Sequence, residues 1–244
     1  MRLALNGSTL GACSFAEELA AAASAGFQLV ELRAPKLAGI DDPGSLLRAN
    51  GLSAWSINSL DGTGDGDLAE EARRQAAWAA SCDCPYVICV PGRRRDGLED
   101  AVARLAEICS QEGAALAFEF MGFGWSAVRR LQDALDIHPG QVVIDTFHWL
   151  LGDGSLESLR ACPPNRIAVV HVNDANSHHL SSLGDADRVL PGDGVLDLTA
   201  FYSTLRAIGY DGVYSLELFP DPLPAEGALL AARGAHAAMV RLFL

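Results

Sequence analysis

The sequence predicts a single-domain α/β protein, a closed (β/α)8 or TIM barrel that spans residues 1–244. Three observations predict this fold. Short apolar runs alternate with longer helical patterns, the alternation occurs eight times, and 244 residues is an ordinary length for such a barrel. No shift in composition marks a second domain. A doubly wound open sheet is the alternative, but such a sheet usually contains fewer strands.

The predicted strands have the β-branched or continuous apolar character of strands that are buried on both faces. In chain order they cover residues 3–8, 27–32, 53–58, 86–91, 115–120, 142–147, 167–173 and 213–219. Because parallel barrel strands end at one common face, we expect the functional residues to lie at their carboxyl ends.

The predicted helices fall between these strands. Residues Ser14-Phe-Ala-Glu17 form a capping box before an alanine-rich helix, and Gly26 is its stop signal. The other predicted helices cover residues 67–81, 97–111, 126–135, 198–207 and about 224 to the end of the chain.

Two segments lack a periodic pattern. Residues 62–66 are rich in glycine, but they lack the spacing of a phosphate-binding loop and stand among aspartates, so we interpret them as a flexible loop over the barrel mouth. Residues 174–194 show no clear structure, and a loop this long inside a compact domain is usually functional. It follows the seventh strand, so it lies at the carboxyl face.

The composition excludes several classes of function. Acidic residues outnumber basic ones 31 to 18, and the net charge of −13 disfavours nucleic acid and anionic membranes as partners. The single lysine, Lys36, follows a proline, which disfavours Schiff-base chemistry. The chain has neither a signal-peptide pattern nor an apolar run long enough to span a membrane, and its six cysteines form no C-x-x-C motif. A cytoplasmic enzyme for small molecules is therefore expected, with its oligomeric state open and a homo-oligomer among the alternatives.

Four charged or polar residues interrupt the apolar strands near their carboxyl ends. They are Glu119, Asp145, His171 and Glu217, on the fifth to eighth strands. The alternation of side chains along a strand places them on the same faces as Ala117, Val143, Val169 and Ser215. All four can therefore point into the barrel near its mouth.

Three carboxylates and one imidazole in an apolar surrounding must either have raised pKa values or have a compensating cation. One bound divalent metal ion is the simplest answer, and Mn²⁺, Mg²⁺, Co²⁺, Fe²⁺ and Zn²⁺ all suit such a set of oxygen and nitrogen donors. Taken singly, each carboxylate could instead anchor a loop and the histidine could be a core residue. Their equivalent depth on consecutive strands favours the metal site.

Further polar residues stand close to these four. We expect His148, Arg188, Asn6 and Asp174 to contact a substrate, although Arg188 could instead pair with a nearby acid. Glu31, Arg33 and Asn58 end the second and third strands and could line the other half of the mouth.

At these residues the sequence resembles the xylose-isomerase-like barrel superfamily of sugar isomerases, epimerases and family-2 AP endonucleases. Within it, the resemblance is closest to the inosose (2-keto-myo-inositol) isomerases of inositol catabolism. The motifs that carry it include Val30-Glu-Leu-Arg33, Phe118-Glu-Phe-Met-Gly122, Ile144-Asp-Thr-Phe-His148, His171-Val-Asn-Asp174, Asp187-Arg-Val-Leu-Pro-Gly-Asp-Gly194 and Ser215-Leu-Glu-Leu-Phe219.

The resemblance implies that Glu119, Asp145, His171 and Glu217 are metal ligands, and that Glu119 and Glu217 are the catalytic acid and base. It also implies a polyhydroxy ketone substrate whose α-proton moves through a metal-bound cis-enediolate. The chain departs from the inosose isomerases at residues 220–224, where it reads Pro-Asp-Pro-Leu-Pro. This difference affects the expected substrate rather than the metal chemistry.

Three other activities fit the same barrel less well. A dehydratase of the same pathway would remove water through a similar intermediate. A DNA-repair endonuclease would need additional histidines at the ends of the third and fourth strands, and none is present there. A sugar-binding barrel without catalysis would have no need of two glutamates that face one substrate.

Overall fold

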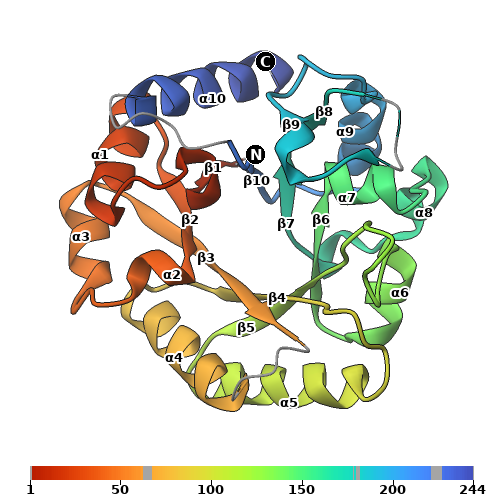
Figure 1. The fold of residues 1–244 in the computed structure, drawn as a ribbon, viewed down its shortest axis with the longest axis horizontal. Helices are drawn as coiled ribbons and strands as arrows, with labels where there is room; N and C mark the ends of the chain where they lie inside the picture. The colour runs from red at the N-terminus through yellow and green to blue at the C-terminus, as the bar shows by residue number, and fades with distance from the viewer. Residues whose placement is uncertain (1, 63–67, 178, 180–181, 221–226, 244) are drawn as a thin grey trace.

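The computed structural model describes residues 2–62, 68–177, 179, 182–220 and 227–243. Its centre is a closed barrel of parallel strands in the order β1-β10-β7-β6-β5-β4-β3-β2 (Figure 1). The strands are β1 Arg2–Asn6, β2 Leu29–Arg33, β3 Ser53–Asp61, β4 Tyr86–Val90, β5 Ala115–Glu119, β6 Gln141–Asp145, β7 Ile167–Val172 and β10 Val213–Leu216. The predicted (β/α)8 barrel is therefore confirmed.

The barrel closes between its first and last strands. β1 pairs in parallel with β10, with Leu5 opposite Leu216, and on its other side β1 pairs with β2. Figure 1 shows α10 and α1, from opposite ends of the chain, side by side on the outside of this junction. Residues far apart in sequence therefore meet at the mouth.

The helices form a layer outside the strands (Figure 1). The α-helices are α1 Phe15–Ala25, α2 Ala34–Leu37, α3 Pro43–Ala49, α4 Leu68–Ser81, α5 Leu98–Gln111, α6 Leu131–Ile137, α7 Thr146–Leu151, α8 Leu156–Ala161, α9 Leu198–Ala207 and α10 Gly227–Phe243. The predicted capping box of α1 is present, and Gly26 ends that helix in the left-handed region with φ of 99°. Within the described ranges, no helix is long and apolar enough to cross a membrane.

Several predicted boundaries were wrong: the strand expected over residues 53–58 continues to Asp61, and the one expected over 213–219 ends at Leu216. Two further differences have clear local reasons. The helix expected over residues 126–135 begins at Leu131. Before it, the N–H of Ala127 donates to Gly92 and the carbonyl of Val128 accepts from Met121, so these groups are not available for helical bonds. The strand expected to reach residue 147 ends at Asp145, because the side chain of Asp145 caps α7.

The long segment after β7 contains more structure than the sequence predicts. Asp174–Ala175 (β8) and Arg188–Val189 (β9) form a small antiparallel sheet at the mouth, with Asp174 opposite Val189. The prediction of an unstructured loop was therefore wrong for these residues. Of the expected glycine-rich loop, residues 63–66 lie outside the described residues.

Two apolar layers support the mouth. The larger lies between the strands and the surrounding helices. The smaller fills the barrel interior and includes Ala4, Ile88, Ala117, Val143 and Val169. Three of these residues share their strand faces with predicted ligands, as the alternation of side chains requires. The polar residues at the strand ends therefore lie next to a layer of buried apolar side chains.

Candidate metal centre and active site

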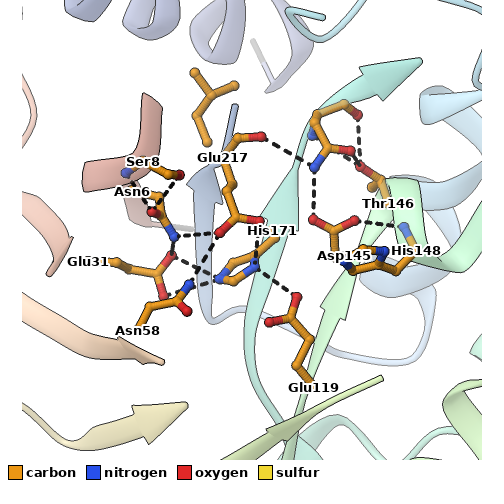
Figure 2. A network of polar contacts seen from close by, with 12 residues as sticks. Asn6, Ser8, Glu31, Asn58, Glu119, Asp145, Thr146, His148, His171 and Glu217 are labelled. Atoms are coloured by element: carbon orange, nitrogen blue, oxygen red, sulfur yellow. Dashed lines mark hydrogen bonds and ion pairs between the residues drawn. The ribbon is translucent and has the colours of Figure 1, made fainter. Parts of the chain in front are cut away.

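The four predicted ligands meet at the carboxyl ends of β5, β6, β7 and β10. One potential ligand atom from each of Glu119, Asp145, His171 and Glu217 lies within 4.8 Å of the others, and all four side chains are buried. Figure 2 shows these side chains pointing toward one another from separate strands. Glu217 follows the last residue of β10 and is held by a backbone hydrogen bond to Val172 of β7 (3.1 Å). The barrel thus assembles the predicted cluster.

His171 lies at the centre of this group. Its Nδ1 is 3.1 Å from Oε1 of Glu119 and 3.4 Å from Oε2 of Glu217, and its Nε2 is 3.1 Å from Oε1 of Glu31. Burial alone would lower the pKa of His171, but the three facing carboxylates raise it well above its usual value. Without a metal, the imidazolium is therefore a counter-ion of the cluster.

Glu31 is an integral member of the site. The sequence places it only among residues that could line the mouth, whereas the structure buries it against His171 and Ser56. Burial would raise the pKa of Glu31, but His171 holds it below the usual range. The same signal that selects the other acids, a carboxylate interrupting an apolar strand near its end, is present in Val30-Glu-Leu32.

Arg188 reaches the cluster from β9. Its Nη1 donates to Oδ2 of Asp145 (2.6 Å) and lies 3.4 Å from Oε2 of Glu217, while its Nε donates to Asp185 (3.2 Å). The alternative noted above, pairing with an acid, is therefore realised. The guanidinium holds two of the predicted metal ligands in place.

His148 contacts the same guanidinium, with Nη2 of Arg188 3.1 Å from its Nε2. A guanidinium can only donate, so Nε2 accepts and the proton of the neutral ring sits on Nδ1. Burial lowers the pKa of His148 to about 4, which keeps the ring neutral. Nδ1 has no hydrogen-bond partner among the described residues, so a buried donor remains free.

The pKa values of the two expected acid/base glutamates are shifted in opposite directions. Burial raises the pKa of Glu119 to about 7, although His171 opposes the shift. Burial would also raise the pKa of Glu217, but His171 and Arg188 hold it well below its usual range. In the metal-free site, Glu119 therefore retains a proton more readily than Glu217. Paired carboxylates with divergent pKa values are typical of acid and base partners.

Amide side chains orient Glu217 and Asp145. Asn6 and Asn58 donate to Oε1 of Glu217 at 3.1 and 3.2 Å, as Figure 2 shows. Asn173 donates to Oδ2 of Asp145 (2.8 Å), and Oδ1 of Asp145 accepts the backbone N–H of His148 (2.8 Å). The ligand orientations are therefore fixed by neutral donors as well as by charge.

The structure gives Asp174 a different role from the predicted substrate contact. Both oxygens of its carboxylate are occupied by backbone N–H groups, with Oδ1 accepting from Ala175 and Leu196, and Oδ2 from Gly192 and Gly194, at 2.9–3.2 Å. Asp174 therefore anchors the loop that carries Arg188. The interruption of an apolar run does not by itself distinguish such an anchor from a ligand.

The donor set fits a divalent cation. Nδ1 of His171 faces Glu119 and Glu217, while its Nε2 faces Glu31 on the opposite side. Histidines that bind metals usually donate their second ring N–H to a carboxylate, and Glu31 is placed to accept it. A cation held by Nδ1 would therefore replace a proton, and Arg188 would keep its contact with Asp145.

Comparison with known proteins identifies the family. The family model described as the xylose isomerase-like TIM barrel matches residues 19–237. The chain belongs to this family. Among its curated relatives, this xylose isomerase-like barrel is 29% identical to the inosose isomerase of Bacillus subtilis (strain 168), over 72% of this chain and 70% of that protein. It is 31% identical to the inosose isomerase of Bacillus licheniformis, over 67% and 64% respectively.

Solved structures agree with the xylose isomerase-like fold. A crystal structure of IolI protein with a bound zinc atom superposes with a TM-score of 0.88, with 23% identity over 99% of this chain and 98% of the other. An L-ribulose 3-epimerase superposes with a TM-score of 0.78, at 20% identity over 99% and 94%. The curated relatives support an enzyme of the isomerase type.

Proposed function

We propose that the protein is a divalent-metal-dependent isomerase or epimerase of a polyhydroxy ketone, an inosose or a ketose. The observation that carries the proposal is the pair Glu119 and Glu217. Both are buried at one cluster of donor atoms, and the pKa of the first is raised while that of the second is lowered. The inosose isomerase relatives favour an inosose among the polyhydroxy ketones.

Glu119, Asp145, His171 and Glu217 would hold the metal, as the predicted ligand set requires. A bound divalent ion would act as a Lewis acid that polarises the substrate carbonyl and so acidifies the neighbouring C–H bond. The zinc of the IolI structure belongs to that protein and leaves the choice of metal here open.

The chain's own residues then move the proton. One of the two glutamates, Glu119 and Glu217, would remove the proton α to the carbonyl, and the other would return a proton at the neighbouring carbon or on the other face. Asn6 and Asn58 keep Glu217 oriented, and Nδ1–H of His148 is free to donate to a substrate oxygen.

A dehydratase is the second candidate, and one specific observation favours it. The curated relatives also include an inosose dehydratase of Bacillus velezensis, 29% identical over 56% of this chain, and a 3-dehydroshikimate dehydratase of Pseudomonas putida, 29% identical over 51%. Removal of the same α-proton starts both reactions. They differ in whether a hydroxyl group then leaves.

Solvent-exchange NMR tests the proposal. The metal-loaded protein is incubated in D₂O with an inosose and with several ketohexoses. Deuterium at the α-carbon together with a new isomer is the expected result, whereas an unsaturated product would indicate the dehydratase. If no substrate exchanges its α-proton under conditions in which metal binding is verified, the proposal is wrong.

A further inference from the structure

A cavity lies at the barrel mouth and is lined by residues that follow members of the cluster along the chain. It has a volume of about 290 Å³ and is formed by the segments that follow β1, β2 and β10, including Gly7, Arg33, Lys36 and Phe219. No carboxylate lines it within the described part of the chain. A cavity lined by two cations and no acid is unexpected in a protein with a net charge of −13.

The cavity walls continue the strands that build the cluster. Gly7 comes directly after Asn6, and Arg33 and Phe219 come two residues after Glu31 and Glu217. Arg33 also shares the inward face of β2 with Glu31. Two residues of a strand rise by about 6.6 Å. A substrate whose reacting carbons lie at the glutamates would therefore extend its far end toward this cavity.

The two cations differ in their availability. Nζ of Lys36 donates to the buried carboxylate of Glu18 (2.6 Å) and to the carbonyl of Gly7 (3.0 Å), so its charge is compensated. Arg33 is half-buried and has neither a hydrogen bond nor an ion pair with any residue that the structure describes. Its guanidinium lies over the ring of Phe219, 5.8 Å from the ring centre.

We infer that this cavity receives an anionic group, a carboxylate or a phosphate, at the end of the substrate remote from the reacting carbons, and that Arg33 binds it. This inference rests on the proposed function, and among its substrates it selects ketoses that carry a carboxylate or a phosphate over the neutral inososes. A planar guanidinium matches both anions, because its paired N–H groups can contact two oxygens at once.

A simpler role for Arg33 makes a different prediction. Arg33 contributes to the low pKa of Glu217, so it could only balance the charge of the cluster. In that case the removal of Arg33 would weaken the binding of neutral and anionic substrates alike. An anion site instead requires that the loss be confined to anionic substrates.

The test uses three ketoses that differ only at the far end: D-fructose, D-fructuronate and D-fructose 6-phosphate. Their binding to the metal-loaded protein is measured by calorimetry for the parent, Arg33→Gln and Arg33→Lys. Arg93→Gln is the matched control, because Arg93 is an exposed arginine that follows β4 and lies over Trp125. Circular dichroism verifies that each variant is folded.

One of the two anions should bind the parent protein at least ten-fold more tightly than fructose, and which one it is distinguishes carboxylate from phosphate. Arg33→Gln should weaken the binding of that anion roughly ten- to hundred-fold and leave the binding of fructose unchanged. Arg33→Lys should retain part of the preference, and Arg93→Gln all of it. Equal binding of the three ketoses, binding of none, or an equal loss for fructose and the anions in Arg33→Gln overturns the inference.

Proton exchange on the same ketoses separates the two proposals. Anion binding that depends on Arg33, without exchange on any of these ketoses or on an inosose, would contradict the proposed function and leave the anion site standing. Exchange on all three ketoses without preference would support the proposed function and overturn the anion site.

Discussion

At the scale of single residues, the candidate site combines buried charges of both signs. Glu31, Glu119 and Glu217 surround His171, and Arg188 contacts Glu217 and Asp145. Burying ions without partners costs several kcal/mol each, so every carboxylate here depends on a proton, a guanidinium or a metal for compensation. Changing any one member should alter the protonation of the others.

The first prediction concerns the two glutamates. Glutamine keeps an oxygen that can contact a cation but cannot accept a proton at neutral pH. Glu217→Gln should therefore reduce α-proton exchange by about 10²–10⁴-fold, the range typical of general acid–base catalysis. Glu119→Gln should reduce return of the proton to a similar degree. Both are measured by deuterium incorporation.

Metal content must be restored with excess ion before these variants are compared, because loss of a ligand alone would mimic the result. A metal-loaded Glu217→Gln protein with near-normal turnover would show that Glu217 is only a ligand. The base would then have to be another residue.

The second prediction concerns Arg188. Its removal leaves the buried carboxylates of Asp145 and Glu217 without their guanidinium. Breaking such a buried pair costs about 3–5 kcal/mol, so Arg188→Met should lower the unfolding free energy of the metal-free protein by this order. Urea unfolding in a chelator measures the loss, and added divalent metal should recover part of it.

Arg130→Met is the matched control, since Arg130 and its partner Asp153 are both exposed. Exposed pairs contribute about 0–1 kcal/mol. If Arg188→Met is as stable as the parent in chelator, Arg188 does not compensate the two carboxylates.

The sequence is sufficient to predict that Glu119, Asp145, His171 and Glu217 cluster, because each interrupts an apolar strand near its carboxyl end on the face that points into the barrel. It does not reveal which neighbour each side chain meets. For this reason the sequence does not identify Glu31 as a member of the cluster and assigns Asp174 to substrate binding. It also leaves the contact of Arg188 with an acid as one of two alternatives. These outcomes depend on the register between strands and on the path of a loop, neither of which has a local pattern.

At the scale of elements, the segment after β7 has only short regular elements among the residues that the structure describes. One carboxylate, that of Asp174, gathers the N–H groups of residues 175, 192, 194 and 196. Because this segment carries Arg188, its anchoring and the geometry of the charged cluster are linked.

The third prediction tests that anchor. In Asp174→Asn, an amide NH₂ replaces one accepting oxygen and faces N–H groups instead of binding them. The variant should lose about 2–3 kcal/mol of stability and become easier to cleave between residues 176 and 190. Thermal unfolding and limited proteolysis measure the two effects. Asp193→Asn, an exposed change in the same segment, should match the parent, and equal behaviour of both variants would contradict the assignment.

The regular elements differ in how well the sequence predicts them. The strands are recognisable in the sequence as short apolar runs. The long helices are recognisable because their apolar pattern repeats over several turns; they are α1, α4, α5, α9 and α10. The short helices α2, α3, α7 and α8 contain four to seven residues, too few for a period to emerge. The start of α7 is also difficult to predict from the sequence, because Asp145 is both the last residue of β6 and the N-cap of α7.

At the scale of the whole molecule, a bound metal should stabilise the fold by mass action. At a free concentration one hundred times the dissociation constant, the gain is about 2.7 kcal/mol. For a chain of this length that corresponds to a rise of roughly 5–10 °C in Tm. Calorimetry with metal and with chelator measures it, and Glu119→Ala should reduce the difference.

The gain should also grow with pH. The pKa of Glu119 is raised to about 7 and that of His171 is raised as well, so both groups contribute stability to the metal-free protein at low pH that is lost as the pH rises. Metal binding requires both groups to release their protons. The difference in Tm between metal and chelator should therefore be smaller at about pH 5.5 than at about pH 8. A difference that is constant across this range would exclude proton competition.

The contact between Asn6 and Glu217 joins residues 211 positions apart. Translation completes Asn6 long before Glu217, and the chain grows at about 5–20 residues per second. A nascent chain on the ribosome therefore contains Asn6, Glu119, Asp145 and His171 for several seconds before Glu217 is added. We expect metallation to follow release of the chain, so the abundance of active enzyme in a cell depends on the metal available to finished molecules.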